Sequence, residues 1–356
     1  MLELPTTHIL GFIIKLYLHV RVISSMILNM DIDWDAKVLS SLTPVINNLR
    51  EIQINNQEIE NVADWLAYEE FPSPQNNKTK KNPEEVIRTT LLVNTLNFAF
   101  TDFEKSIKYE IERDGYIFSD SEAMFTQINE TLATGTKLYH GDVLSSLDMD
   151  KLNKIFSGNI EMPMMSERLK ILNEVGEKLS SEYKGDWINF INKGPKKLYS
   201  DGEGLIERLI EEFPRFDDKT ILEDRQEVHF YKLAQLAFWG IHGELSGGGH
   251  FVVEDMHKMS AFADYIVPVA LEVMKIITYS ETLNNKIMNG ELIERDSREE
   301  VEIRAVSLYT TAKLTEEVNK RRPLDKQIII PQLDYRLWKQ YHATHRPHHL
   351  TITTMY

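Results

Sequence analysis

The sequence predicts a mostly α-helical protein folded as one large domain, because three segments carry apolar residues at the spacing of an amphipathic helix. These segments are residues 205–213, 230–238 and 303–314. Helices with one apolar stripe bury it against a neighbouring element. The chain has 356 residues, 42% of them hydrophobic, which is enough for a sizeable core.

The elements can be placed in order along the chain, beginning with an N-terminal extension. We expect residues 1–34 to lie outside the main domain, which spans residues 35–356. Residues 9–28 are rich in apolar side chains, but Lys15, His19 and Arg21 interrupt them. No run reaches the length of a membrane-spanning helix. The extension is therefore expected to be an amphipathic or dispensable segment, with a targeting element as the alternative.

Proline and glycine mark the connections between the later elements. Residues 72–82 combine two prolines with a polar run and predict a solvated loop. A second loop is expected at residues 247–249, and Pro323 predicts the end of the third helix. A few short strands remain compatible with the pattern, for example at residues 327–330.

Charge and composition exclude several classes of function. The chain carries 40 basic and 55 acidic residues, a net charge of -15, and would repel a nucleic-acid polymer. A small anionic ligand is compatible, since it requires only a local cation. The sequence has no cysteine, so disulfides, thiolate metal sites and a cysteine nucleophile are excluded. We expect a cytoplasmic protein without a membrane partner.

Asp264 is the first candidate for catalysis, because it lies among large apolar side chains where an unused charge is costly. Phe262 precedes it and Pro268 follows it, and Pro268 disfavours helix at the residue before it. Asp264 either accepts backbone N–H groups near a helix start or faces a ligand cavity. In the second case its charge would stabilise an oxocarbenium-like transition state on a sugar.

A second carboxylate occurs in a similar setting about seventy residues later. Asp334 and Tyr335 are followed by Trp338 one helical turn later. Together these residues could offer one ligand a carboxylate acceptor, a phenol and an indole. Aromatic rings stack on flat heterocycles, and a carboxylate accepts from ring or amine N–H groups. The alternative is an aromatic core cluster with one capped aspartate.

Lys232 lies within the apolar segment at residues 230–239. It either extends to solvent or faces an anion, for which phosphate is the natural partner. The glycines at 247–249 lack the lysine and serine or threonine of a phosphate-binding loop. The C-terminal histidines lack acidic partners at a fixed spacing, so no metal and no organic cofactor is expected.

An ordered series of motifs along the chain resembles the queuosine salvage proteins, the queuosine 5'-phosphate N-glycosylase/hydrolase family. The resemblance begins near residue 35 and extends to the C-terminus. Its matching pieces are residues 94–100, 163–176, 213–218, 230–235, 259–268, 300–305, 334–338 and 348–349.

The resemblance implies a mostly helical fold similar to that of helical DNA glycosylases. It also implies hydrolysis of the N-glycosidic bond of queuosine 5'-phosphate, which releases queuine for reuse in tRNA modification. By the same carry-over, Asp264 is the catalytic carboxylate and Phe262 stacks on the base. Asp334 and Tyr335 bind base or sugar, and Lys232 meets the phosphate. The substrate is then a small nucleotide, and the oligomeric state is left open.

The chain departs from the family pattern at Thr101, Leu233, Lys339 and Leu350. Lys339 stands where the family generally has an acidic residue, so it would reverse the charge of a substrate-binding position. The alternative function is therefore a divergent, non-catalytic member that binds a nucleotide or a protein partner. A DNA glycosylase is a third reading, and the negative charge argues against it.

Overall fold

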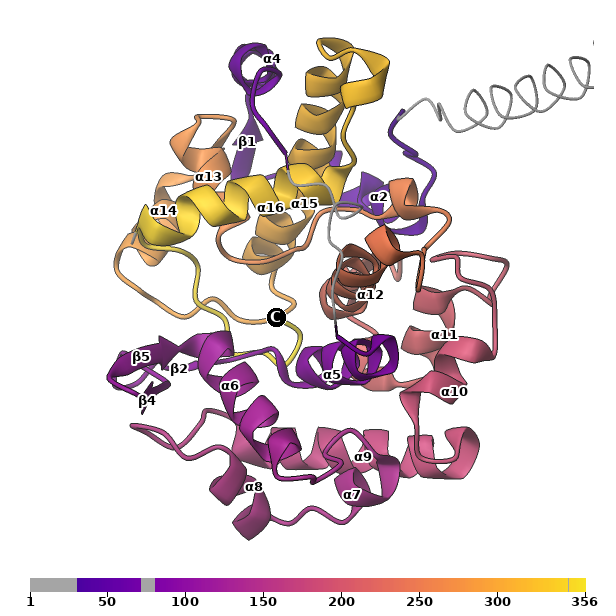
Figure 1. Ribbon diagram of the computed structural model, residues 1–356. Coiled ribbons are helices and arrows are strands. Elements are labelled where there is room, and N and C mark those ends of the chain that lie inside the picture. Colours follow the sequence, from indigo (N-terminus) through magenta and orange to yellow (C-terminus); the bar gives the residue numbers. More distant parts are fainter. Residues whose placement is uncertain (1–30, 72–80, 345) are drawn as a thin grey trace, which may run out of the picture.

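The computed structural model describes residues 31–71, 81–344 and 346–356. Within these ranges the chain forms fifteen α-helices and four two-stranded antiparallel sheets (Figure 1). This confirms the mostly α-helical single domain. Most of the predicted N-terminal extension and of the loop at 72–82 lies outside the described residues. The boundary at residue 34 stays a prediction, although Trp34 already packs on Tyr309, with ring centroids 5.4 Å apart.

All three predicted helices are present. The first is α11 (Leu205–Glu212), the second α12 (Lys232–Leu245) and the third α15 (Arg298–Lys320). Helix α12 begins two residues later than the apolar pattern, because Tyr231 takes a left-handed backbone conformation at the helix entry. Helix α15 ends before Pro323 as expected.

The helices enclose two hydrophobic cores. One is built on α5 (Pro83–Leu96), α9 (Met165–Tyr183) and α12. The other is built on α4 (Asn56–Leu66), α13 (Val267–Val273) and α16 (Ile330–Tyr341). Figure 1 shows α16 and α4 above and α5 and α9 below. Helix α15 contributes buried residues to both cores, so it joins them into one domain.

The remaining helices complete the two layers. They are α2 (Lys37–Ser41), α3 (Thr43–Ile46), α6 (Asp120–Ala133), α7 (Gly141–Ser145), α8 (Met149–Ile155), α10 (Trp187–Asn192) and α14 (Glu281–Met288).

Each sheet is a pair of short strands. β1 (Ile52–Ile54) pairs with β8 (Ile277–Tyr279) and so brings two distant parts of the chain together. The other pairs are β2 (Thr101–Asp102) with β3 (Ile107–Lys108), β4 (Glu110–Arg113) with β5 (Tyr116–Ser119), and β6 (Lys219–Ile221) with β7 (Glu227–His229).

The short strand expected at residues 327–330 is wrong. Residues 327–329 belong to none of the strands of the described chain, and α16 begins at Ile330. Pro331 occupies the first turn of α16, where its missing N–H and fixed φ suit a helix. The side chain of Gln332 accepts the Ile329 N–H at 3.0 Å. These helix-start features outweigh the β-propensity of three successive isoleucines.

The C-terminal segment runs through the middle of the molecule, between the two helical layers (Figure 1). Leu350 forms a bridge with Leu292, and the Ile293 N–H donates to the Leu350 carbonyl at 2.8 Å. The Tyr356 side chain is buried and its hydroxyl donates to Glu300 at 2.9 Å. The last residues therefore belong to the packed interior and help to wall the site described next.

Candidate active site

A cavity of about 800 Å³ lies where the two cores meet. Its walls come from α12, α16, the segment before α13, the turn after α5 and the C-terminal segment. The residues that were predicted from sequence and that line it are Lys232, Phe262, Asp264, Asp334 and Tyr335. The fold thus brings together side chains that are up to a hundred residues apart.

Asp264 is buried just before α13, with 7% of its surface exposed. Its Oδ1 accepts the N–H groups of Ile266 at 2.9 Å and Val267 at 3.0 Å. Its Oδ2 has no hydrogen-bond partner in the described residues. Both sequence interpretations therefore hold at once: one oxygen binds the helix start, and the carboxylate also lines the cavity.

Asp334 is the second carboxylate in the same cavity and is 2% exposed. Its Oδ2 accepts the Phe262 N–H at 2.9 Å, which ties α16 to the segment that carries Asp264. Burial raises the pKa of Asp334 well above its usual range, and the negative charge of Asp264 adds to the effect. The two carboxyl groups are therefore chemically different despite their shared cavity.

Two pairs of aromatic rings line the cavity. Phe262 lies 6.5 Å from Trp239 of α12, measured between ring centroids. Tyr335 and Trp338 of α16 are stacked with centroids 6.2 Å apart. All four line the cavity. Flat apolar faces beside carboxyl groups suit a planar heterocycle with polar edges.

Lys232 is the first residue of α12 and is 8% exposed. It lines the cavity and does not extend to solvent. Burial lowers the pKa of Lys232, while nearby Asp264 opposes that shift. Its ammonium group has no hydrogen-bond or ion-pair partner among the described residues. A buried lysine that lines a cavity without an ion-pair partner is suited by its chemistry to an anionic group.

Two buried arginines shape the wall that follows α5. Arg168 donates to the carbonyls of Leu96 at 2.6 Å and Ala99 at 2.7 Å, and also to that of Phe98. Arg215 donates to the Thr95 carbonyl at 2.7 Å. These bonds satisfy the carbonyls of a turn that leaves the helix, including a left-handed Ala99. These hydrogen bonds are a structural reason for arginine in the family motifs at residues 163–176 and 213–218.

Lys339 is the predicted site residue that the structure does not bring to the cavity. It is exposed on α16 and is not among the lining residues. Successive residues of a helix point about 100° apart, so Trp338 can face the cavity while Lys339 faces solvent. Of the other departures, Thr101 lines the cavity and Leu233 is buried in the core.

The sequence interpretation missed several lining residues. Tyr265 and His348 stack on each other with centroids 4.4 Å apart, and His349 and Tyr356 complete the same side. The matched pair His348 and His349 was a signal for this wall. Tyr356 had none, because nothing in the tail pattern shows that the segment folds back into the interior.

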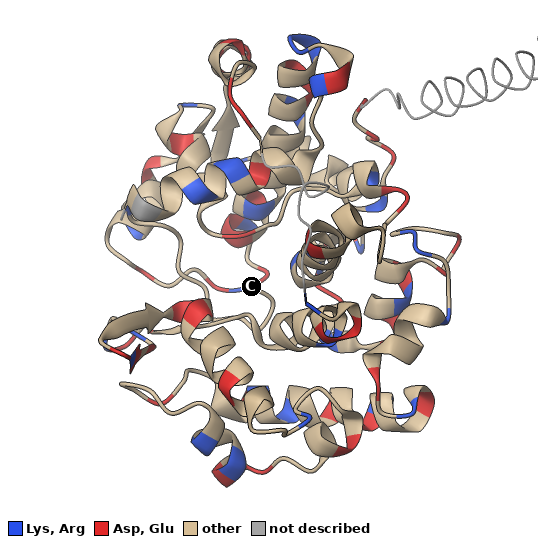
Figure 2. Cartoon of the chain, viewed as in Figure 1, with Lys and Arg blue, Asp and Glu red and all other residues tan. Residues whose placement is uncertain are grey.

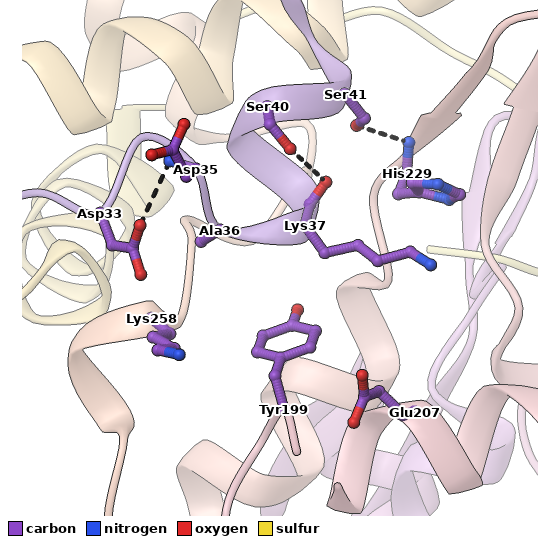
Figure 3. Close-up of a pocket in the computed structure, with 10 residues that line it drawn as sticks. All are labelled: Asp33, Asp35, Ala36, Lys37, Ser40, Ser41, Tyr199, Glu207, His229 and Lys258. Carbon is purple, nitrogen blue, oxygen red and sulfur yellow. Dashed lines mark hydrogen bonds between the residues drawn. The ribbon is translucent and has the colours of Figure 1, made fainter. Parts of the chain in front are cut away.

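A second hollow, of about 590 Å³, lies beside α2 (Figure 3). Its polar groups are mostly bonded within the protein. The Asp35 N–H donates to Asp33 at 3.2 Å, and the His229 N–H donates to Ser41 at 3.0 Å. The Glu207 carboxylate accepts two backbone N–H groups. None of the predicted site residues lines this hollow.

Two features are absent from residues 31–71, 81–344 and 346–356. No group of three or more histidine, aspartate or glutamate side chains is arranged to hold a metal ion in those ranges. No helix described by the structure is both long and apolar enough to cross a membrane.

Fold and site together define a helical domain with a cavity lined by two carboxyl groups, aromatic rings and a buried lysine. The family model described as Queuosine salvage protein matches residues 76–356, and the chain belongs to this family. The family resemblance is thereby confirmed.

Relatives named queuosine 5'-phosphate N-glycosylase/hydrolase match most of the chain. The protein of Mus musculus is 26% identical over 315 residues, covering 85% of this chain and 91% of the relative. That of Sphaerobacter thermophilus is 26% identical over 326 residues, covering 90% and 97%. That of Dictyostelium discoideum is 28% identical over 283 residues, covering 79% and 81%. The similarity thus spans bacteria and eukaryotes.

Proposed function

We propose that this protein hydrolyses the N-glycosidic bond of queuosine 5'-phosphate, releasing queuine and ribose 5-phosphate. The observation that carries the proposal is the cavity in which Asp264, Phe262, Asp334 and Lys232 meet. The names of the relatives that cover most of the chain support the same reaction. Action on a free nucleotide, in the cytoplasm and without a membrane partner, is part of the proposal.

Cleavage of this bond develops positive charge on the ribose and negative charge on the departing base. Asp264 is the group assigned to the ribose, where its carboxylate stabilises the positive charge or bonds to C1'. The N–H groups of Ile266 and Val267 fix the direction of that carboxylate. The oxygen of a water molecule then bonds to C1' of the ribose, or displaces Asp264 from it, and the proton released neutralises the departing base, giving ribose 5-phosphate and queuine.

The base is assigned to the part of the cavity lined by aromatic rings. Phe262 provides a face for stacking, and Tyr335 lies beside Asp334 on α16. Burial raises the pKa of Asp334, which favours its neutral form, and a neutral carboxyl group can both donate to and accept from the base. The phosphate is assigned to Lys232, whose charge has no other partner in the described chain.

The non-catalytic alternative rested largely on Lys339. That side chain lies outside the cavity, so it does not reverse the charge at the assigned site. The DNA glycosylase alternative requires a basic surface. Figure 2 shows acidic and basic residues interspersed along the helices, and the net charge is -15.

The test is a chromatographic assay after incubation of the purified chain with queuosine 5'-phosphate. Equimolar queuine and ribose 5-phosphate are expected. A rise in melting temperature with the nucleotide, without any queuine, would instead support the binding-only alternative. If the folded protein shows no rise in melting temperature and no queuine release, both the hydrolase function and the binding-only alternative are contradicted.

A further inference from the structure

Two matched motifs that have no assigned role meet beneath the cavity. One ends in Asp218, just before β6, and the other carries Glu300 and Arg304 on α15. Arg304 is 1% exposed and binds both oxygens of Asp218, at 3.0 and 2.5 Å. Its second acidic neighbour is Glu300 at 3.5 Å. Removing one partner from a buried ion pair of this kind is strongly destabilising, so the two carboxylates and Arg304 depend on each other.

Asp218 in turn holds the entry to α12. Its carbonyl accepts the N–H groups of Phe230 at 2.9 Å and Tyr231 at 3.1 Å. Its carboxylate lies 3.5 Å from the N–H of Lys232. No side chain caps α12 at its own first turn. The Arg304–Asp218 pair therefore fixes the backbone position from which the Lys232 side chain starts.

Tyr356 contacts both the Arg304 network and the Lys232 side chain. Its hydroxyl donates to Glu300 at 2.9 Å, and its ring lies 4.3 Å from the Arg304 guanidinium carbon. The Lys232 ammonium nitrogen lies 5.9 Å from the centroid of the same ring. His349 is 6.0 Å away, centroid to centroid. One ring, held by the buried network, thus lies near the Lys232 ammonium group.

We infer that Tyr356 is a positioning residue for Lys232. Its ring, anchored by Glu300 and Arg304, holds the lysine ammonium extended into the cavity at the place of the substrate phosphate. The aromatic face attracts the cation and also blocks the side chain from turning back toward Arg304. This inference rests on the proposed function, because Lys232 is assigned there to the phosphate.

The test compares kcat/KM for queuosine 5'-phosphate with kcat/KM for free queuosine, and uses the ratio of the two as its readout. Lys232→Met is expected to lower this ratio about 30-fold, and Tyr356→Leu about tenfold. Tyr356→Phe keeps the ring and loses only the hydroxyl bond to Glu300, so its ratio is expected to lie between those of the parent and of Tyr356→Leu. The double variant Lys232→Met/Tyr356→Leu is expected to be no lower than Lys232→Met alone.

A merely structural tyrosine would give a different result. Equal losses on both substrates in Tyr356→Leu, or losses that multiply in the double variant, would overturn the inference. If the leucine variant does not fold, Tyr356→Met takes its place, because its longer and more flexible side chain can fill the space left by the ring in a different way. Failure of the parent to release queuine would contradict the proposed function itself, whereas a releasing parent with an unchanged ratio in Tyr356→Leu contradicts only the inference.

Discussion

The cavity beside Asp264 and the hollow beside Tyr199 contain similar residue types, yet their polar groups differ in what they bind. In the hollow, Nδ1 of His229 is hydrogen-bonded to the Tyr231 hydroxyl at 2.8 Å. Each region also holds a buried side-chain atom without a partner in the described residues, Nε2 of His349 in the cavity and the Tyr199 hydroxyl in the hollow. The cavity differs in having a buried lysine, Lys232, whereas the lysines of the hollow are exposed or half-buried. A buried lysine is costly without an anionic partner, so it distinguishes the cavity from the hollow.

The largest expected effect is a loss of stability when the buried network of Arg304, Asp218 and Glu300 is broken. Arg304→Met is expected to destabilise the fold by roughly 3–5 kcal/mol, because it leaves Asp218 and Glu300 buried without their cation. Urea unfolding measures the change. Lys320→Met, at an exposed pair with Glu317 on the same helix, is the control and should cost at most about 1 kcal/mol. Equal effects would show that burial of the network adds nothing.

The second effect is a pH dependence of stability. Burial lowers the pKa of His349 to about 3, and the nearby cations Arg304 and Lys232 add to the effect. The neutral ring therefore stabilises the fold above its unfolded pKa of about 6.5, and this contribution is lost as pH falls toward 3. About 2 kcal/mol should disappear between pH 7 and pH 5 through this residue.

His349→Gln lacks that component, so its unfolding free energy should fall less steeply over the same range. Denaturant unfolding at several pH values gives the two slopes. The exposed His250→Gln serves as the control and should follow the parent. A His349→Gln profile parallel to that of the parent would show that His349 is not buried as a neutral ring.

The third effect distinguishes base binding from phosphate binding. Phe262→Leu is expected to lower kcat/KM about tenfold, because a stacked base contributes on the order of 1–3 kcal/mol. The loss should be equal for queuosine 5'-phosphate and for free queuosine, since both carry the same base. Steady-state kinetics on the two substrates measures it. A loss confined to the phosphorylated substrate would remove Phe262 from the base site.

The smallest effect belongs to the hollow. Lys258→Met is expected to leave kcat/KM for queuosine 5'-phosphate within about twofold of the parent, because Lys258 lines the hollow and not the cavity. The same release assay measures it. A larger loss of activity in a folded variant would show that the hollow takes part in the reaction and would erase the contrast between the two regions.

The sequence predicted those cavity residues whose immediate neighbours in the chain make them unusual. Asp264, Asp334 and Lys232 are charged groups inside apolar segments, and such groups are costly unless paired or used. The family resemblance added roles that the pattern alone left open. The structure then showed that a helix-start aspartate and a cavity-lining aspartate are the same residue, which sequence reasoning had treated as alternatives.

The remaining parts depend on contacts between distant segments. Tyr356 reaches the cavity only because the tail passes between two helical layers, and no local signal encodes that path. Lys339 was placed at the site by motif position, whereas the rotation of α16 turns it to solvent. The isoleucines before Pro331 suggested a strand, and the helix start at Ile330 prevailed.

The measurement that tests the central claim most directly is queuine release from queuosine 5'-phosphate by three proteins side by side: the parent, Asp264→Asn and Asp33→Asn. Asparagine at 264 keeps an oxygen for the Ile266 and Val267 N–H groups but loses the negative charge, so the fold should persist while kcat falls at least about 10³-fold. Asp33→Asn, in the hollow, should match the parent. Release that survives in folded Asp264→Asn, or is lost in folded Asp33→Asn, would contradict the assignment of the reaction to this cavity.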